Sequence, residues 1–181
     1  MRTESLHQLQ RACWEELERA SQERAHGWRL MTLATVESGR AEARSVILRE
    51  ADPAGHCLVF FTDARSPKLR QIQAHPQGTM LAWCPRLSWQ IRLRVALSRE
   101  TDPHLTATRW ERLRQSPAAQ DYLSPRAPGE PLGEGASEER GSRGHFAMVN
   151  ARVQSMDWLE LRPDGHRRAV FDTAGGHWVQ P

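Results

Sequence analysis

Residues 87–99, LSWQIRLRVALSR, alternate apolar and polar side chains along the segment. Because successive side chains of an extended chain point to opposite faces, this period of two predicts a β-strand buried on one side. The apolar face carries Trp89, Ile91, Leu93, Val95 and Leu97. This is the clearest strand pattern in the sequence, and it indicates a fold built mainly on strands.

Other strand-like segments lie before and after it in the sequence. They cover residues 29–36, 42–49, 57–62, 79–84, 146–161, 168–172 and 177–179. Turn residues at 37–40 and at Asp164-Gly165 predict hairpins between neighbouring strands. Short strands joined mostly by short turns favour a small barrel, since a doubly wound sheet needs regular alternation of strands and helices.

A few helices are inserted between the strands. The spacing of apolar residues predicts an amphipathic helix over 5–25, within an N-terminal helical region 1–27 that ends at Gly27. Shorter helices are expected after Ser66-Pro67, Asp102-Pro103 and Ser116-Pro117, where a capping residue precedes a proline. The predicted fold class is therefore mainly β with inserted helices (α+β).

Residues 124–144 differ in composition from the rest of the chain. They contain three prolines and five glycines and show no periodicity, which predicts a mobile loop. The whole chain, 1–181, has the length of a single domain.

Composition excludes several classes of protein. Residues of the hydrophobic types make up 39% of the chain and charged residues 26%, as in ordinary globular domains. No apolar run approaches the length of a membrane span, and the first residues are too polar for a signal peptide. Three dispersed cysteines and dispersed histidines predict no disulfide framework and no metal site, and free thiols suit the cytoplasm. The net charge of +3 permits an anionic ligand without requiring nucleic acid.

The segment FFTDARSPK, residues 60–68, joins an apolar strand to the start of a helix. Free N–H groups at a helix start, the Ser66 hydroxyl and the Lys68 ammonium together favour an anion, most often a phosphate. A capped helix with a solvated lysine is the simpler interpretation, and this segment alone does not exclude it.

Two strands carry unexpected polar residues. Arg44 shares a strand face with Val46 and Leu48, so it needs an anionic partner unless it reaches solvent or pairs with a glutamate. Gln90 lies in a polar row with Arg92 and Arg94 on residues 87–99, which predicts a half-open environment or plain solvent exposure.

An aromatic residue and a basic residue flank the turn at Asp164-Gly165. If Trp158 and Arg168 lie near each other across this hairpin, an aromatic plane and a guanidinium would suit a flat ligand. The alternative is a tryptophan that belongs to the core.

Taken together, these segments resemble one family. ARSVILRE (43–50), VFFTDARSPK (59–68), the strand from Trp89, and DWLELRPDGHRR (157–168) occur in the order and spacing of the pyridoxamine 5'-phosphate oxidase-like, FMN-binding split-barrel proteins. The similarity covers roughly residues 28–181 and is weakest over 101–145. It implies a split β-barrel homodimer with FMN in clefts between the subunits.

The resemblance also implies which residues contact the cofactor. The matching positions are Arg44, Ser45, Val46, Arg49, Phe61, Thr62, Ser66, Lys68, Gln90, Trp158 and Arg168. Arg44, Ser66 and Lys68 match residues on the FMN phosphate, and Gln90 matches a glutamine that reaches the flavin across the interface. His166 matches a substrate-side residue.

The sequence departs from the oxidases of this family at several positions. Phe61 stands where they have tyrosine, Pro67 replaces a cofactor-side arginine, and Arg49 replaces a lysine that serves cofactor and substrate. Asp164 replaces an arginine and would repel a substrate phosphate. The substrate residues of the middle helix have no clean match in RWERLRQSPAAQDYL, residues 109–123.

These observations predict an FMN-binding protein, a flavin oxidoreductase of unassigned substrate, in which no residue is identified as a general base. The alternatives are a true pyridoxamine/pyridoxine 5'-phosphate oxidase and a non-catalytic flavin carrier or sensor. A small basic barrel for nucleic acid is supported by a pI near 9.1. Its arginines are not interleaved with exposed aromatic residues, however, as base stacking requires.

Overall fold

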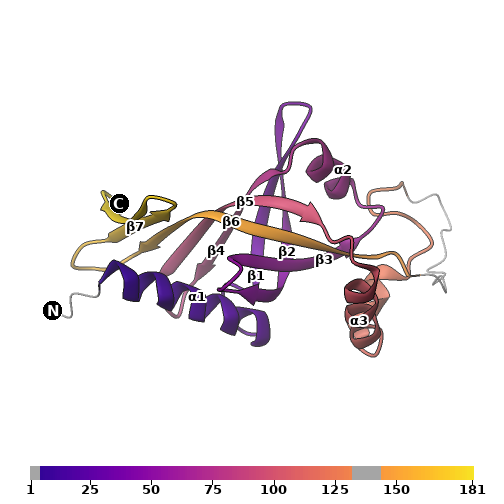
Figure 1. Cartoon of the computed structure of the whole chain (residues 1–181), viewed down its shortest axis with the longest axis horizontal. Helices are drawn as coiled ribbons and strands as arrows, with labels where there is room; N and C mark the ends of the chain where they lie inside the picture. The colour runs from indigo at the N-terminus through magenta and orange to yellow at the C-terminus, as the bar shows by residue number, and fades with distance from the viewer. Residues whose placement is uncertain (1–4, 132–143) are drawn as a thin grey trace.

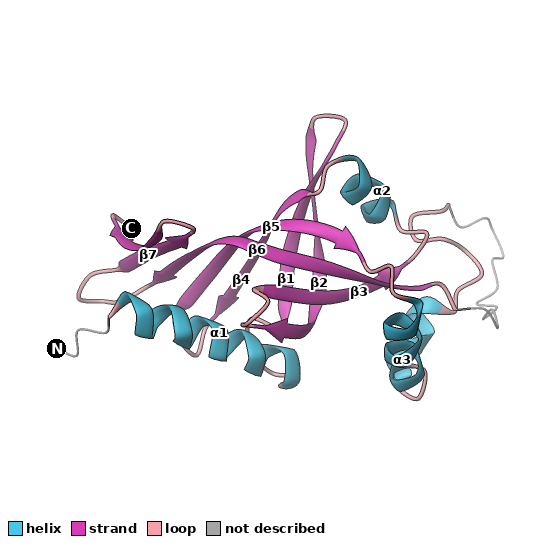
Figure 2. Cartoon of the chain, viewed as in Figure 1, coloured by secondary structure: helices cyan, strands magenta, loops and turns pink. Residues whose placement is uncertain are grey.

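The computed structural model describes residues 5–131 and 144–181. Its strands are β1 (Leu30–Glu37), β2 (Arg40–Asp52), β3 (Cys57–Asp63), β4 (Gln77–Cys84), β5 (Trp89–Arg99), β6 (Phe146–Glu160), β7 (Arg167–Asp172) and β8 (Gly175–Val179). The helices are α1 (Leu6–Gln22), α2 (Pro67–Ala74), α3 (Pro103–Leu113) and the 3-10 helix η1 (Pro117–Tyr122). The mainly β fold with inserted helices predicted from the sequence is confirmed (Figure 2).

One antiparallel sheet forms a barrel. The strand order is β3-β2-β1-β4-β5-β6-β7-β8, and an additional pairing of β3 with β6 closes the first six strands into a ring. The first half of β6 pairs with β3 and its second half pairs with β7, so β6 leaves the ring. The β7–β8 hairpin therefore extends beyond the barrel (Figure 1).

The hairpin between β1 and β2 forms where the turn was predicted. Ser38 and Gly39 both have positive φ, at 50° and 76°, as the tight turn of a two-residue hairpin requires. Register then runs without interruption from the turn to Leu30, which pairs with Ile47. This register sets which face each side chain of β2 occupies.

The barrel interior and α1 make one core. Apolar side chains of alternate strand positions, such as Leu33, Phe60 and Ile91, are fully buried in it. The predicted amphipathic helix covers the sheet with Leu9 and Leu17 and lies along one side of it in Figure 1. Gly27 is needed because a Cβ there would lie 2.7 Å from the Cα of Cys84.

Two local predictions differ in detail from the structure, and a third can be compared only in part. The first helix ends at Gln22 rather than near residue 25. The helix after Ser116-Pro117 is a 3-10 helix. Residues 124–131 are irregular as expected, whereas 132–143 of the predicted mobile loop lie outside the described residues.

Helices α2 and α3 lie toward the end of the barrel opposite the β7–β8 hairpin (Figure 1). The segment that was predicted to bind an anion is therefore at this end. None of the helices described is long and apolar enough to cross a membrane.

Candidate functional site

The strongest candidate site lies where β3 ends and α2 begins. The Lys68 ammonium donates to Thr62 Oγ1 and to Ser66 Oγ, both at 2.8 Å. The Ser66 side chain makes no N-cap hydrogen bond, although the sequence predicted a cap, because its hydroxyl faces the lysine instead. The hydroxyls of Thr62 and Ser66 are buried with the ammonium between them.

Arg44 approaches the same place from β2. It pairs with Leu33, so its side chain leaves the strand on the core face, as the alternation predicted. Its guanidinium donates to the hydroxyl of Thr35 and, at 2.8 Å, to Oε1 of Gln71 on α2. The Gln71 amide nitrogen in turn donates to Glu37 at 3.0 Å.

Arg44 and Lys68 carry charges of the same sign and repel each other. The pKa of Lys68 is lowered by burial first and by the charge of Arg44 second, with Asp63 offsetting part of this effect. The pKa of Arg44 is also lowered, chiefly by burial. Among the described residues neither cation forms an ion pair with a carboxylate, and their direct partners are neutral oxygens. We call Arg44, Thr62, Ser66 and Lys68 the cradle.

Two members of this hydrogen-bonded group were missed in the sequence. Thr35 is a buried hydroxyl on the apolar face of β1, and its polarity on that face was the available signal. Gln71 lies one helical turn after Lys68, on the buried side of α2. Both hold Arg44 in place through uncharged contacts.

Gln90 and Arg168 lie on the other face of the sheet. Gln90 pairs with Leu159, and Leu159 pairs with Arg168, so their side chains share one face. Arg44 shares the opposite face with Leu33. Within one chain the structure therefore does not bring Gln90 or Arg168 to the cradle.

Arg168 is held by an acidic partner. Asp157 accepts two hydrogen bonds from it, at 2.9 and 2.8 Å, and also pairs with Arg92. The pKa of Asp157 is lowered: the hydrogen bonds and charges of these two arginines outweigh burial, which acts in the opposite direction. We call Asp157, Arg92 and Arg168 the Asp157 cluster.

Trp158 and Arg168 do not face each other. Trp158 pairs with Ala169 and is fully buried, and its indole N–H has no hydrogen-bond partner among the described residues. The guanidinium above its ring belongs to Arg167, 5.3 Å from the ring centroid. The expectation of a Trp158–Arg168 ligand face is therefore wrong within one chain, because the register places them on opposite sides of the β6–β7 ribbon.

The remaining predicted positions follow the strand pattern. Ser45 is exposed and Val46 is buried, as neighbours on β2 should be. His166 lies in the exposed turn between β6 and β7, where its Nδ1 accepts from the Arg162 amide at 3.1 Å. Arg49 lies over the ring of Phe61, 5.5 Å from its centroid.

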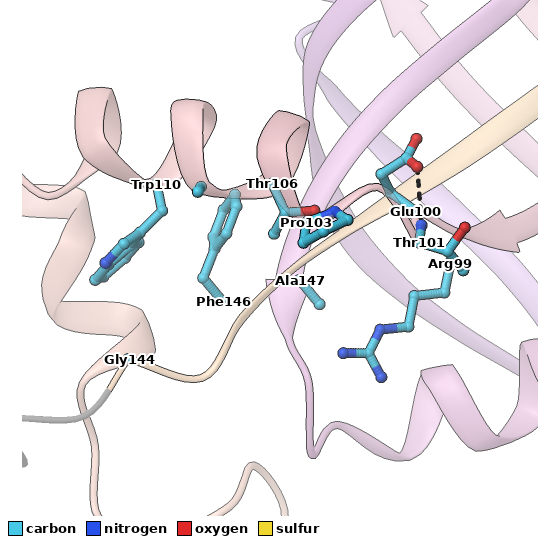
Figure 3. Close-up of a pocket in the computed structure, with 10 residues that line it drawn as sticks. Arg99, Glu100, Thr101, Pro103, Thr106, Trp110, Gly144, Phe146 and Ala147 are labelled. Carbon is cyan, nitrogen blue, oxygen red and sulfur yellow. Dashed lines mark hydrogen bonds between the residues drawn. The ribbon is translucent and has the colours of Figure 1, made fainter.

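A pocket of about 600 Å³ opens between α3 and the adjoining ends of β5 and β6 (Figure 3). Trp110 and Phe146 form an aromatic wall at one end, and Arg99 lies at the other. Gly144 allows the wall to form, since a Cβ there would lie 2.9 Å from the indole of Trp110. None of the four cradle residues lines this pocket.

Two features define the class of protein: a split barrel, and a pair of partly buried cations at a helix start that form no ion pair with a carboxylate among the described residues. A family model for the "pyridoxamine 5'-phosphate oxidase, FMN-binding domain" matches residues 11–98. A pyridoxine/pyridoxamine 5'-phosphate oxidase of Caulobacter vibrioides is 28% identical over 178 residues, covering 91% of this chain and 79% of the relative. Another, of Thermosynechococcus vestitus, is 32% identical over 128 residues, covering 70% of this chain and 53% of the relative.

Solved structures agree on the fold. A pyridoxamine 5'-phosphate oxidase-related, FMN-binding protein of Nostoc punctiforme superposes with a TM-score of 0.75 at 22% identity, covering 94% of this chain and 97% of the other. PhzG of Burkholderia lata, solved with tetrahydrophenazine-1-carboxylic acid, superposes with a TM-score of 0.73 at 18% identity, covering 94% of this chain and 91% of the other. The chain belongs to the pyridoxamine 5'-phosphate oxidase-like family of split-barrel, FMN-binding proteins.

Proposed function

We propose that this protein binds FMN, with the cofactor phosphate in the cradle, and acts as a flavin-dependent oxidoreductase. The observation that carries the proposal is the pair Arg44 and Lys68, which are partly buried and share no carboxylate partner among the described residues. Burying unneutralised cations costs free energy that a dianionic phosphate would offset. The two hydroxyls between them add hydrogen-bonding groups for phosphate oxygens.

We further propose that Gln90 and Arg168 serve the cofactor of a second copy of the chain, whereas Trp158 supports this region from the core. Gln90 and Arg168 lie on the sheet face opposite to Arg44, so they can reach a flavin only across an interface. On that face, Leu30, Leu81 and Trp83 of adjacent strands β1 and β4 are exposed by 55%, 37% and 40%. A homodimer that covers this apolar face would bring the two half-sites together.

The residues of the chain would bind and orient the cofactor. FMN, when bound, supplies the redox chemistry by accepting a hydride from a substrate. Arg44, Ser66 and Lys68 would fix its phosphate, and the aromatic side chain of Phe61 would help exclude water. Gln90 is a neutral donor that could stabilise charge on the reduced ring, and no residue is assigned as general base.

A second candidate is pyridoxamine/pyridoxine 5'-phosphate oxidase activity, since the relatives from Caulobacter and Thermosynechococcus carry that name. Asp164 argues against it. This residue lies in the exposed turn before β7 as a carboxylate paired with Arg162, and would repel a substrate phosphate. Production of pyridoxal 5'-phosphate by the FMN-loaded protein would establish this candidate, and its absence would leave another substrate to be found.

The test of the proposed function is the absorbance spectrum of the freshly purified protein, with the released chromophore identified by chromatography. We expect a yellow protein with near-stoichiometric FMN. A protein that stays colourless after FMN is added would show that the family fold is used here without flavin. Turnover with an amine or quinone would distinguish an enzyme from a flavin carrier or sensor.

A further inference from the structure

One arginine side chain ties the segment after η1 to the loop that leads into the cradle. The Arg65 guanidinium donates to the carbonyl oxygens of Ser124, Pro125 and Arg126, at 2.9, 3.0 and 3.1 Å. These three residues are consecutive in the chain, and Arg65 directly precedes a residue of the cradle. A single side chain therefore connects two segments that are about 60 residues apart in sequence and lie at the α2 end of the barrel (Figure 1).

The same guanidinium is fixed by Asp63, the last residue of β3. It donates to the two carboxylate oxygens at 3.1 and 2.7 Å, and the Arg65 amide donates to the same carboxylate at 2.7 Å. The Asp63 side chain is only 4% exposed. Burial acts to raise the pKa of Asp63, but the hydrogen bonds and charge of Arg65 outweigh burial, so the pKa is lowered. This two-point contact with a buried carboxylate orients the planar guanidinium toward the three carbonyl oxygens.

We call residues 124–131 the strap. Three of its eight residues are proline, and it has no helix or strand. Because proline has no N–H, regular backbone pairing is not open to this segment, and the Arg65 side chain serves its carbonyls instead. At the other end of the strap, a Cβ on Gly129 would lie 3.9 Å from Pro67, the first residue of α2. The strap therefore runs from the end of η1 to the start of α2, beside the loop that carries the cradle.

We propose that Arg65 is a positioning residue for the cofactor phosphate: it clamps the strap against the loop between β3 and α2, so that this loop releases the phosphate only when the strap opens. An irregular loop opens locally at low free-energy cost unless it is tied to its neighbours. The clamp slows the release of FMN without changing which group the cradle recognises. This inference rests on the proposed function, because the phosphate in the cradle is taken to be that of FMN.

The clamp itself is tested by limited proteolysis of the FMN-free protein with trypsin, which cleaves after arginine. We expect Arg65→Met to raise the rate of cleavage after Arg126 of the strap by about tenfold, because cleavage requires the strap to leave its place. Mass spectrometry of the peptide that ends at Arg126 measures this rate. Arg70→Met is the matched control, since the partner of this exposed α2 arginine among the described residues is Glu37 and not the strap. Equal cleavage rates in Arg65→Met and wild type would overturn the proposal.

The positioning role is tested by stopped-flow measurement of FMN release. We expect Arg65→Met to release FMN about fivefold to tenfold faster than wild type, because the loop is no longer held in its binding conformation. The dissociation constant of riboflavin, which lacks the phosphate, should be unchanged, whereas a merely structural role would weaken both flavins. Arg65→Lys keeps the charge and loses the planar fork, so it should behave like Arg65→Met. Release at the wild-type rate in either variant would contradict the clamp.

A double variant separates the strap from the charge of Asp63. Arg65→Met leaves this buried carboxylate without its partner. Burial lowers the pKa of Lys68, and Asp63 is close enough for its charge to oppose that effect, so a freed carboxylate would compete with the phosphate. In Asp63→Asn/Arg65→Met the carboxylate is gone and the strap is still untied, so strap cleavage and FMN release should both stay fast. A return of FMN release to the wild-type rate would refute the clamp and assign the effect to Asp63.

The failure of this inference differs from the failure of the proposed function. If the protein binds no FMN, the proposed function is wrong and the role of Arg65 in phosphate binding is lost with it. If FMN binds and Arg65→Met releases it at the wild-type rate, the positioning role is wrong and the proposed function stands.

Discussion

The molecule contains two groups of cations that differ in what neutralises them. In the Asp157 cluster, Arg92 and Arg168 share one carboxylate, whose lowered pKa keeps it ionised. In the cradle, Arg44 and Lys68 contact only hydroxyl and amide oxygens, and their pKa values are lowered instead. Both cations of the Asp157 cluster have a carboxylate partner, whereas neither cation of the cradle has one among the described residues. An anionic cofactor is therefore expected at the cradle, even though the Asp157 cluster contains as many cations.

The comparison is tested most strongly by removing cradle cations. Lys68→Met and Arg44→Met should each weaken FMN binding by about 10- to 100-fold, because a charge-assisted hydrogen bond contributes about 1.5–3 kcal/mol. Fluorescence quenching of FMN on titration measures the dissociation constant. Arg70→Met is the matched control, since Arg70 is an exposed cation of α2 that pairs with Glu37 at the surface. Stoichiometric FMN retained in both cradle variants would refute the phosphate assignment.

Asp157→Asn should destabilise the fold, whereas substitutions of the cradle cations should not. It leaves Arg92 and Arg168 without a counter-charge, and because both are partly exposed we expect a loss of about 1–2 kcal/mol in the free energy of unfolding. Urea denaturation at neutral pH measures this loss. Lys68→Met should leave the free energy of unfolding of the FMN-free protein equal or higher, since it removes a cation that burial disfavours.

The same carboxylate predicts a pH effect on stability. The folded-state pKa of Asp157 lies below its ordinary value. The contribution of this carboxylate to the free energy of unfolding is therefore present when the pH is above the ordinary pKa, and it is lost as the pH falls through the lowered pKa. The difference in stability between wild type and Asp157→Asn should therefore shrink in acid. A difference that stays constant from neutral to strongly acidic pH would contradict the pairing.

A smaller effect is expected at alkaline pH, where loss of the Lys68 proton should weaken FMN binding. Because burial and Arg44 lower the pKa of Lys68, part of the ammonium is lost at a pH where an exposed lysine is still protonated. FMN affinity should be constant near neutral pH and fall as the pH rises toward this lowered value. Lys68→Arg should keep its affinity to higher pH, and an identical fall in this variant would place the titrating group elsewhere.

The local sequence was sufficient to predict the residues of the cradle, but it was not sufficient to predict the residues that hydrogen-bond to them from other elements. The strand alternation placed Arg44 on the core face, and the segment from Thr62 to Lys68 is short enough for its polar groups to meet. Thr35 and Gln71 come from other elements, and only tertiary packing brings them to Arg44.

Strand register explains the main error. Trp158 and Arg168 belong to neighbouring strands, and a difference of one residue in register decides whether two side chains share a face. Here Trp158 pairs with Ala169, so Arg167 rather than Arg168 covers the indole. The positions of the strands along the chain and the mainly β class depended on longer patterns and were predicted correctly.

The central claim is that the cradle recognises the phosphate of FMN. The most direct measurement compares the dissociation constants of FMN and riboflavin, which differ only in that phosphate, for wild type and Lys68→Met. The account predicts that wild type binds FMN at least about 100-fold more tightly than riboflavin, as expected for two charge-assisted contacts. In Lys68→Met most of this preference should disappear while riboflavin affinity is unchanged. Equal affinities for FMN and riboflavin in wild type would contradict the account.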